Sequence, residues 1–435
     1  MRVLAKDIKI AAEKGEKEIV LSGWVHRIRE LGALSFVLLR DRSGIVQLVL
    51  SEKHDLTLES VISVRGQPEL NEKAPGGAEL RVSALECISR AANDLPYQVN
   101  ADIAKIGLEA ILDYRLLSLR NPKIRAIFKV QATIIEAFSA YLRDKDFTEI
   151  KTSKLVSGGT EGGTELFEVE YFDKKVCLAQ SPQFYKETMV ASGLERVFEV
   201  APAYRAEKHD TPRHLNEYVS MDVEMAFIES ERDLIGLEKG ILAHIFDELE
   251  RKNAADIALW AENGASVPSP ESVEKSPIIP YEEAIKIANH EASKKKGARI
   301  FDINPEAERF VCEWSEKEHG SALVFVNEFP RRYRPFYTYP LDATCTMSFD
   351  ALFRGLEITT GGRRQHDYKT FLETLPKFGL KAEDFEDGYL RLLKYGCPPH
   401  GGFAIGCERL TARVLHLANV KEASLFPRDR KRVSP

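Results

Sequence analysis

The chain contains no run of about 18 apolar residues, which is the length that a membrane-spanning helix needs. Its amino terminus, Met-Arg-Val-Leu-Ala-Lys-Asp, also lacks the apolar core of a signal peptide. We therefore expect a cytoplasmic protein without a membrane span.

Cysteine is scarce, with six in 435 residues, and the six do not show the short spacing of metal ligands. We expect reduced, packed thiols rather than a disulfide or zinc framework. The six are Cys87, Cys177, Cys312, Cys345, Cys397 and Cys407.

Charge of either sign is not in large excess, since the formal net charge is -6. This argues against bulk attraction to nucleic acid but leaves room for a local basic face. With 44% hydrophobic residues, the chain is long enough for two or three domains and a large core.

The first 100 residues have the pattern of a small β domain. Five alternating segments separated by turn signals predict a small closed barrel. An aromatic ring and arginines on its surface would suit single-stranded nucleic acid, although Phe36 could instead belong to the core and the arginines could only solubilise the domain. The expected strands are Val20–Val25, Leu34–Leu39, Ile45–Leu50, Ser60–Val64 and Glu79–Val82, and the surface residues are Phe36, Arg27, Arg29, Arg40 and Arg42.

A long helix should follow this domain, because Asn121-Pro122 is typical of a helix start. We expect residues 1–100 to form the barrel, residues 101–125 a hinge, and residues 126–435 a second domain. The apolar stripe of the helix is Ile124, Ile127, Phe128, Ile135, Phe138 and Leu142.

After the helix, Phe147–Leu155 resembles a strand, and a glycine-rich segment follows at 157–164. Four glycines suit a loop that closes over a ligand, although an ordinary surface loop is the alternative. Residues 256–278 form a polar connection before a helix that begins near Tyr281.

Residues 197–227 alternate on both sides of a polar loop, which predicts two antiparallel strands. Arg205 and Glu207 should share a face of the first strand. Gathering these charges is costly unless a polar ligand binds there, whereas a solvated sheet face is the plain alternative. On the second strand, Tyr218, Ser220, Asp222 and Glu224 share one face, and Val219, Met221, Val223, Met225 and Phe227 share the other.

Two later strands, Thr346–Phe353 and Gly355–Thr360, should turn at Arg354-Gly355 and bring Asp350 near Glu357. Two such carboxylates fit an oxygen-ligated Mg²⁺ shared with phosphates, although paired surface acids are the commoner explanation. The glycine-rich strand at 400–407 then runs into a helix expected over Glu408–Leu417, which would place Arg409 where the helix dipole also favours anions.

Taken together, these stretches resemble the class II aminoacyl-tRNA synthetases over essentially the whole chain, and most resemble the aspartyl branch of the compact archaeal type. Arg205-Ala-Glu207 matches the start of the family's motif 2, and Gly402-Phe-Ala-Ile-Gly-Cys-Glu-Arg-Leu410 matches motif 3. The carboxyl end, Phe426–Pro435, resembles the aspartate branch. The resemblance implies an α+β protein with an amino-terminal OB-fold barrel that grips the anticodon, a catalytic antiparallel sheet flanked by helices, and a homodimer.

The resemblance also implies ATP and Mg²⁺ as substrate and metal. Arg205 would clamp the α-phosphate, and Arg409 and Tyr218 would lie on opposite faces of adenine. Asp350 and Glu357 would ligate Mg²⁺. The remaining nucleotide contacts would come from Glu207, His214 and Leu215.

For the amino acid, the resemblance implies aspartate. Lys186 and Arg364 would hold its side-chain carboxylate, and Asp222 would position both cations. Its ammonium group would contact Ser181, Gln183 and Glu161, next to Gly361.

On the barrel, the resemblance implies that the anticodon is bound by His26, Arg27, Phe36, Gln47 and Pro75. His26 and Pro75 resemble enzymes that accept both tRNA(Asp) and tRNA(Asn). We therefore expect a non-discriminating enzyme that charges both.

Two residues depart from the family pattern. Ser153 replaces the usual proline of motif 1 at the dimer interface, and Arg363 replaces a glutamine, which would add a cation beside the pocket. Three other functions compete with the main interpretation: an asparaginyl-tRNA synthetase, a paralogue that adenylates aspartate for small-molecule synthesis, and a catalytically inactive RNA-binding protein.

Overall fold

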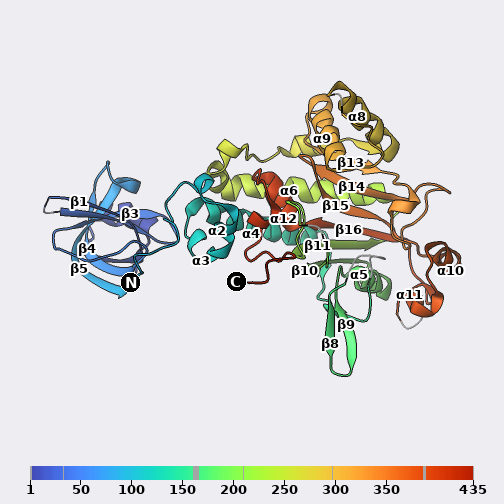
Figure 1. The fold of residues 1–435 in the computed structure, drawn as a ribbon, viewed down its shortest axis with the longest axis horizontal. Coiled ribbons are helices and arrows are strands. Elements are labelled where there is room, and N and C mark those ends of the chain that lie inside the picture. The colour runs from blue at the N-terminus through green and yellow to red at the C-terminus, as the bar shows by residue number, and fades with distance from the viewer. Residues whose placement is uncertain are drawn as a thin grey trace. The chain divides into compact units, whose positions relative to one another are not determined.

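A computed structural model describes residues 2–32, 34–159, 166–208, 210–295, 297–385 and 388–434. The chain divides into two compact units, residues 1–117 and 118–435 (Figure 1). Among the described residues, no helix is both long enough and apolar enough to cross a membrane.

The first unit contains a closed barrel with the strand order β1-β2-β3-β5-β4, as the sequence predicts. The third strand has the expected bounds, and the other four extend further than expected. A short helix, α1 (Ile8–Glu13), adds Ile8 and Ala11 to the apolar core. The strands are β1 (Ile19–Leu31), β2 (Leu34–Arg40), β3 (Ile45–Leu50), β4 (Val61–Leu70) and β5 (Ala78–Ser89).

The segment expected to be a hinge carries local structure. It contains a short turn of helix at Ile103–Lys105, α2 (Leu108–Asp113) and α3 (Arg115–Ser118). Asn121 accepts a hydrogen bond from the backbone of Lys123 and caps the next helix, α4 (Pro122–Asp144), because its side chain satisfies a backbone N–H at the helix start.

The second unit is organised around an eight-stranded sheet in the order β12-β13-β14-β15-β16-β11-β10-β6 (Figure 1). Neighbouring strands are antiparallel except for the pairs at the two edges. The strands are β6 (Thr148–Glu149), β10 (Arg196–Tyr204), β11 (Glu217–Ala226), β12 (Ile278–Pro280), β13 (Leu323–Asn327), β14 (Ser348–Phe353), β15 (Leu356–Arg363) and β16 (His400–Gly406).

Helices cover one face of this sheet. α4 packs with α6 (Glu231–Ala258) and α12 (Cys407–Val414) in one apolar core that also includes Met221 and Val223 of β11. Because side chains alternate along a strand, the neighbouring polar residues of β11 face the opposite side. That side is left for the functional site.

Smaller elements complete the unit. α8 (Tyr281–Lys294) and α9 (Pro305–His319) share a core with β13, and α7 (Pro270–Glu274) lies within the expected polar connection. The other elements are α5 (Gln183–Met189), α10 (Tyr368–Thr374), α11 (Tyr389–Lys394) and a three-stranded sheet of β7 (Leu155–Val156), β9 (Lys174–Leu178) and β8 (Glu168–Tyr171).

The predicted strand Phe147–Leu155 is wrong for most of its length. Only β6 and the first residue of β7 fall within it. Thr152 donates hydrogen bonds to the buried Glu199 carboxylate through its backbone N–H and its hydroxyl, each at 2.8 Å, and Lys154 donates at 3.1 Å. Side-chain bonds therefore hold this segment in place of a strand ladder.

The six cysteines are all free, as expected, but they are not all packed. Cys312 and Cys407 are buried, Cys87 is exposed, and the other three are partly buried.

Candidate active site

A cavity of about 320 Å³ lies on the polar face of the sheet. It brings together nearly all the residues expected to bind the nucleotide or the amino acid. Asp350 does not line it, and Glu161 lies outside the described residues. The expected residues in its lining are Ser181, Gln183, Lys186, Arg205, Glu207, His214, Leu215, Tyr218, Asp222, Glu357, Gly361, Arg364 and Arg409.

The hairpin of β10 and β11 supplies one wall. Strand β10 ends at Tyr204, so the prediction that Arg205 and Glu207 lie within it is wrong. The Asn216 side chain donates to the backbone oxygens of both residues, at 2.7 and 3.2 Å, and holds the loop against the cavity. Phe227 also lies past its strand, 68% exposed and with a positive φ of 58°, because the chain turns there towards α6.

At the nucleotide end, Arg409 donates from Nη1 to the backbone oxygen and to Oε1 of Glu357, each at 3.0 Å. The Arg205 guanidinium lies 5.7 Å from the centre of the Tyr218 ring, within range of a cation–π contact. His214 Nε2 is 3.5 Å from Glu207 Oε2. Cations and rings therefore surround the space in which a nucleotide would lie.

Two further residues at this end were missed from the sequence. Arg213 lines the cavity and forms an ion pair with Glu308 of α9. The same Glu308 oxygen accepts from the backbone N–H of Glu357 at 2.9 Å. Burial raises the pKa of Glu308, although Arg213 opposes the rise. No local pattern marks a glutamate about 95 residues from its arginine.

The expected metal pair, Asp350 and Glu357, comes from β14 and β15. Asp350 is opposite Thr360 in the strand register, and Arg334 Nη2 is 2.8 Å from Asp350 Oδ1 without a well-aligned hydrogen bond. Burial, together with the charge of Glu357, raises the pKa of Asp350 to about 7, although Arg334 opposes the rise.

Glu357 lies close enough to raise the pKa of Asp350, and a cation shared by the two carboxylates would relieve this repulsion. Thr360 adds a hydroxyl 3.4 Å from Glu357 Oε1. The described residues contain no cluster of three or more metal-ligating side chains. A pair of carboxylates is a donor set that Mg²⁺ accepts, because this ion usually takes one or two protein carboxylates and completes its shell with phosphate and water.

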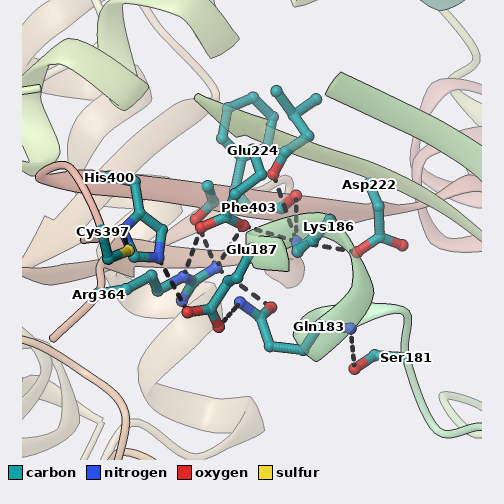
Figure 2. A network of polar contacts seen from close by, with 12 residues as sticks. Ser181, Gln183, Lys186, Glu187, Asp222, Glu224, Arg364, Cys397, His400 and Phe403 are labelled. Carbon is teal, nitrogen blue, oxygen red and sulfur yellow. Dashed lines mark hydrogen bonds and ion pairs between the residues drawn. The ribbon is translucent and has the colours of Figure 1, made fainter. Parts of the chain in front are cut away.

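The amino-acid end of the cavity contains a buried ion cluster of Lys186, Asp222, Glu224 and Arg364 (Figure 2). Lys186 Nζ is 3.0 Å from Asp222 Oδ1 and 3.3 Å from Glu224 Oε2. Arg364 Nε donates to Glu224 Oε1 at 3.0 Å. The expectation that Asp222 positions both cations is therefore wrong. Glu224 bridges the two cations, whereas Asp222 contacts Lys186 and Ser220 but not Arg364.

Glu224 was not predicted as a site residue, although strand alternation had placed it on the same face as Asp222. Glycine at position 402 makes room for it. A Cβ atom at Gly402 would lie 2.2 Å from Glu224 Oε2 and 2.0 Å from the backbone oxygen of Val223. The glycine-rich strand thus lets a carboxylate lie directly across β16.

Gly361 lines the cavity, but core packing rather than ligand binding explains why this position is a glycine. A Cβ atom there would lie 2.6 Å from the Cβ of Phe403 and 2.8 Å from the ring of Phe349, which are both core residues.

The two departures from the family pattern lie away from the cavity. Arg363 donates to the backbone oxygen of Glu229 at 2.8 Å and lies over the Tyr339 ring, so it adds no cation to the cavity lining. Ser153 is exposed, and its hydroxyl donates to the backbone of Leu155.

On the barrel, Arg27, Phe36 and Gln47 share one face. Arg27 pairs with Leu38, which pairs with Gln47 on β3. In the next row Arg29 pairs with Phe36, which is partly exposed and does not belong to the core. Directly paired residues point to the same side of a sheet, so these side chains form one outward patch.

His26 occupies a break in the register between Val25 and Arg27. Such bulges re-aim a side chain. Its Nδ1 is 2.9 Å from Arg40 Nη1, and Arg40 also donates two hydrogen bonds to Glu59. Arg40 is 1% exposed, so the prediction that it lies on the surface is wrong, because Glu59 and His26 cover it. Pro75 is exposed in the turn before β5.

Comparison with known proteins agrees with this architecture. Residues 107–430 match the family of class II tRNA synthetases (D, K and N), and residues 19–88 match the OB-fold nucleic acid binding domain. An aspartate–tRNA(Asp/Asn) ligase of Thermus thermophilus is 47% identical, with all of both chains covered. One from Deinococcus radiodurans is 44% identical over 96% of this chain and 95% of the other.

Among solved structures, an asparaginyl-tRNA synthetase from Pyrococcus horikoshii, complexed with asparaginyl-adenylate, matches with a TM-score of 0.89 and 32% identity, and both chains are fully covered. The family matches and the fold similarity together cover nearly the whole chain, and the cavity contains the residues that the family pattern predicts. The chain belongs to the class II tRNA synthetases of the D, K and N group.

Proposed function

We propose that this protein is an aspartate–tRNA ligase that activates aspartate with ATP and transfers it to tRNA(Asp) and tRNA(Asn). The observation that carries the proposal is the buried pair of cations, Lys186 and Arg364, at one end of a cavity whose other end carries Arg205 and Arg409. The two relatives of 44% and 47% identity bear the name of that activity.

In the first step, the α-carboxylate of aspartate attacks the α-phosphate of ATP in line. The bond between the α-phosphorus and the oxygen that bridges to the β-phosphate breaks, so aspartyl-adenylate forms and pyrophosphate leaves. The attacking group is already ionised, so the site needs alignment and charge neutralisation rather than a general base. Arg205 neutralises the α-phosphate, and Arg409 and Tyr218 hold the two faces of adenine. Glu207, His214 and Leu215 complete the nucleotide contacts.

Asp350 and Glu357 would hold Mg²⁺, which when bound neutralises charge on the phosphates. Ser181 and Gln183 would contact the ammonium group of aspartate, together with Glu161 and next to Gly361. In the second step the terminal ribose hydroxyl of the tRNA attacks the aspartyl carbonyl of the adenylate and loses its proton. The acyl–phosphate bond breaks, and AMP leaves.

The choice between aspartate and asparagine rests on Lys186 and Arg364. A neutral amide in place of the side-chain carboxylate would lose charge-assisted hydrogen bonds to both cations, at a cost of roughly 1.5–3 kcal/mol for each bond. The likeness to an asparaginyl enzyme keeps asparagine as the second candidate. ATP–pyrophosphate exchange with each amino acid separates the two. We expect exchange with aspartate; exchange with asparagine alone would refute the proposal.

We assign the barrel, residues 1–100, to the anticodon, and residues 101–125 to a hinge before the catalytic domain at 126–435. The face that carries Arg27, Phe36 and Gln47 offers cations and a ring for unpaired bases, with His26 and Pro75 beside it. The enzyme would act as a homodimer in the cytoplasm, where its tRNA substrates are charged.

Charging of transcripts with GUC and GUU anticodons tests the range of tRNA. We expect both to be aspartylated at comparable rates. Charging of the GUC transcript alone would restrict the function to tRNA(Asp).

A further inference from the structure

Behind the amino-acid end of the cavity lies a second ion pair, formed by Glu187 of α5 and His400 of β16 (Figure 2). Both side chains are 0% exposed, and neither lines the cavity. His400 Nε2 is 2.9 Å from Glu187 Oε2, and the Tyr389 hydroxyl donates to the same oxygen at 2.6 Å. None of the roles assigned above uses these groups.

The partners of His400 determine its charge. Its Nδ1 is 2.9 Å from the backbone oxygen of Pro398, which can only accept, and 3.4 Å from the sulfur of Cys397. Its Nε2 faces the carboxylate of Glu187. Both ring nitrogens must therefore carry a proton, which makes the ring an imidazolium. Burial opposes the charge, but bonds to Cys397 and Glu187 outweigh it and raise the pKa of His400 to about 10.

Glu187 in turn determines the orientation of the Gln183 amide. Burial favours a neutral acid, yet the bond and charge of His400 lower the pKa of Glu187, so the carboxylate can only accept. Gln183 Nε2 donates to Glu187 Oε1 at 2.7 Å. The amide oxygen must then point the other way, where it accepts from Arg364 Nη2 at 3.3 Å.

This chain of contacts continues to the cation that would meet the substrate. Arg364 is held by Gln183, by Glu224 and by the backbone oxygen of Gly402 at 3.0 Å. These bonds use Nε and Nη2. The remaining nitrogen, Nη1, is the one that Arg364 can offer to a ligand carboxylate, since Arg364 lines the cavity.

We propose that Glu187 and His400 are positioning residues, which fix the Gln183 amide and through it the Arg364 guanidinium, and thereby set the affinity for the side-chain carboxylate of the amino acid. The inference rests on the proposed aspartate activation and specifies how its pocket is held. Without the acceptor-only carboxylate the Gln183 amide can rotate, and its NH₂ group would then face a cation.

The pair is itself neutral, so it supports the pocket without changing the charge there. In the pocket, the two positive charges of Lys186 and Arg364 are balanced by the two negative charges of Asp222 and Glu224. A bound aspartate side chain is then the one uncompensated anion, and it meets two cations whose positions are fixed before it arrives. Preorganisation of this kind favours binding because no group must reorient.

The test is ATP–pyrophosphate exchange with Glu187→Gln, which keeps the shape of the side chain but allows it to donate. We expect the KM for aspartate to rise roughly 10- to 100-fold, as is usual when the support of a binding group is lost, while kcat and the KM for ATP stay within about threefold. Tyr389→Phe is the matched control. It removes a bond to the same carboxylate without altering the ion pair, so the KM for aspartate should change by less than about threefold.

An equal loss in kcat and in both KM values, or an unchanged KM for aspartate, would overturn the proposal. If the single variant does not fold, Glu187→Gln combined with His400→Asn removes both charges, and the same split between the KM values is expected. Wild-type enzyme without aspartate-dependent exchange would instead refute the proposed function itself, so the two failures can be told apart.

A second measurement reads the ion pair directly. In enzyme labelled with ¹⁵N-histidine, difference spectra against His400→Gln identify the ring nitrogens of His400. We expect both nitrogens to be protonated at pH 8. A neutral ring with one proton at that pH would overturn the inference.

Discussion

In the barrel, His26 lies against a buried arginine, whereas in the catalytic unit His400 lies against a buried carboxylate. Arg40 donates towards Nδ1 of His26, so that nitrogen carries no proton and the ring is neutral. Burial lowers the pKa of His26, and the charge of Arg40 lowers it further. His400 faces two acceptors and is a cation.

The difference shows that burial alone does not decide the charge of a histidine. Each ring takes the protonation state that its nearest partner requires, and each partner is itself held by a further group: Arg40 by the Glu59 carboxylate, and Glu187 by the Tyr389 hydroxyl. In the barrel, the neutral ring of His26 keeps its Nε2–H as a donor for a ligand. In the catalytic unit, the charged ring of His400 fixes Glu187 and, through Gln183, the position of Arg364.

The largest effect is expected when a cation is removed from the buried ion cluster of Lys186, Asp222, Glu224 and Arg364. Lys186→Leu leaves Asp222 and Glu224 buried with one cation fewer, so aspartate would meet uncompensated negative charge. We expect aspartate-dependent pyrophosphate exchange to fall by about 1,000-fold or more. Lys175→Leu, the same substitution at an exposed lysine of β9, should leave exchange unchanged. Near-normal exchange in Lys186→Leu would refute the assignment.

The corresponding change in the barrel is Arg40→Leu. It leaves Glu59 buried without its bidentate partner and should lower the free energy of unfolding by about 3–5 kcal/mol. Arg81→Leu removes an equally bidentate but exposed pair with Glu69 and should cost less than about 1 kcal/mol. Urea unfolding of a full-length variant that retains only Trp24, the one tryptophan of the barrel unit, measures both by fluorescence. Equal losses would show that the burial of Arg40 is unimportant.

A smaller effect should come from His26 itself. His26→Phe keeps a ring at the bulge but removes the Nε2–H donor, and with it the hydrogen bond to the anticodon that the proposed function implies. It also removes the Nδ1 acceptor of Arg40. We expect the ratio of GUU to GUC charging to change by about tenfold, which corresponds to about 1.4 kcal/mol. His54→Phe provides a control within the same barrel, since His54 contacts Ser35. A ratio that stays constant in His26→Phe would remove His26 from tRNA choice.

The smallest effect is on pH dependence, and its sign differs between the two histidines. The pKa of His400 is raised, so the stability that its charge contributes is complete below pH 6.5 and is lost as the pH rises towards about 10. The pKa of His26 is lowered, so its contribution is present above pH 6.5 and is lost as the pH falls. Single-tryptophan variants that retain Trp24 or Trp260 report the two units separately. Parallel pH profiles would contradict the opposite charge states.

Sequence patterns were sufficient where a local rule governs the structure. Alternation gave the five barrel strands and the polar face of β11, and the two motifs gave the arginines of the nucleotide end. The rule failed at Phe147–Leu155, because the bonds that hold this segment go to Glu199, about 47 residues away in the chain. The local pattern also failed to predict the burial of Arg40, because no residue near Arg40 in the sequence indicates that Glu59 covers it.

The sequence did not predict that Glu187 and His400 hold the side chains of the amino-acid end of the cavity, for a related reason. Glu187 and His400 are more than 200 positions apart, and the charge of each depends on the other. A motif can mark the residue that touches a ligand, but the side chain behind it becomes visible only once the strands and helices are placed.

Gly402 and Glu224 occupy what is nearly a single volume, and this limits how the chain can diverge. No side chain can enter at position 402 while the acid remains at 224, and loss of that acid would leave Lys186 and Arg364 without the group that joins them. A side chain at position 402 would also meet the backbone oxygen of Val223 at 2.0 Å, so descendants of this sequence should keep glycine at 402 whatever residue stands at 224.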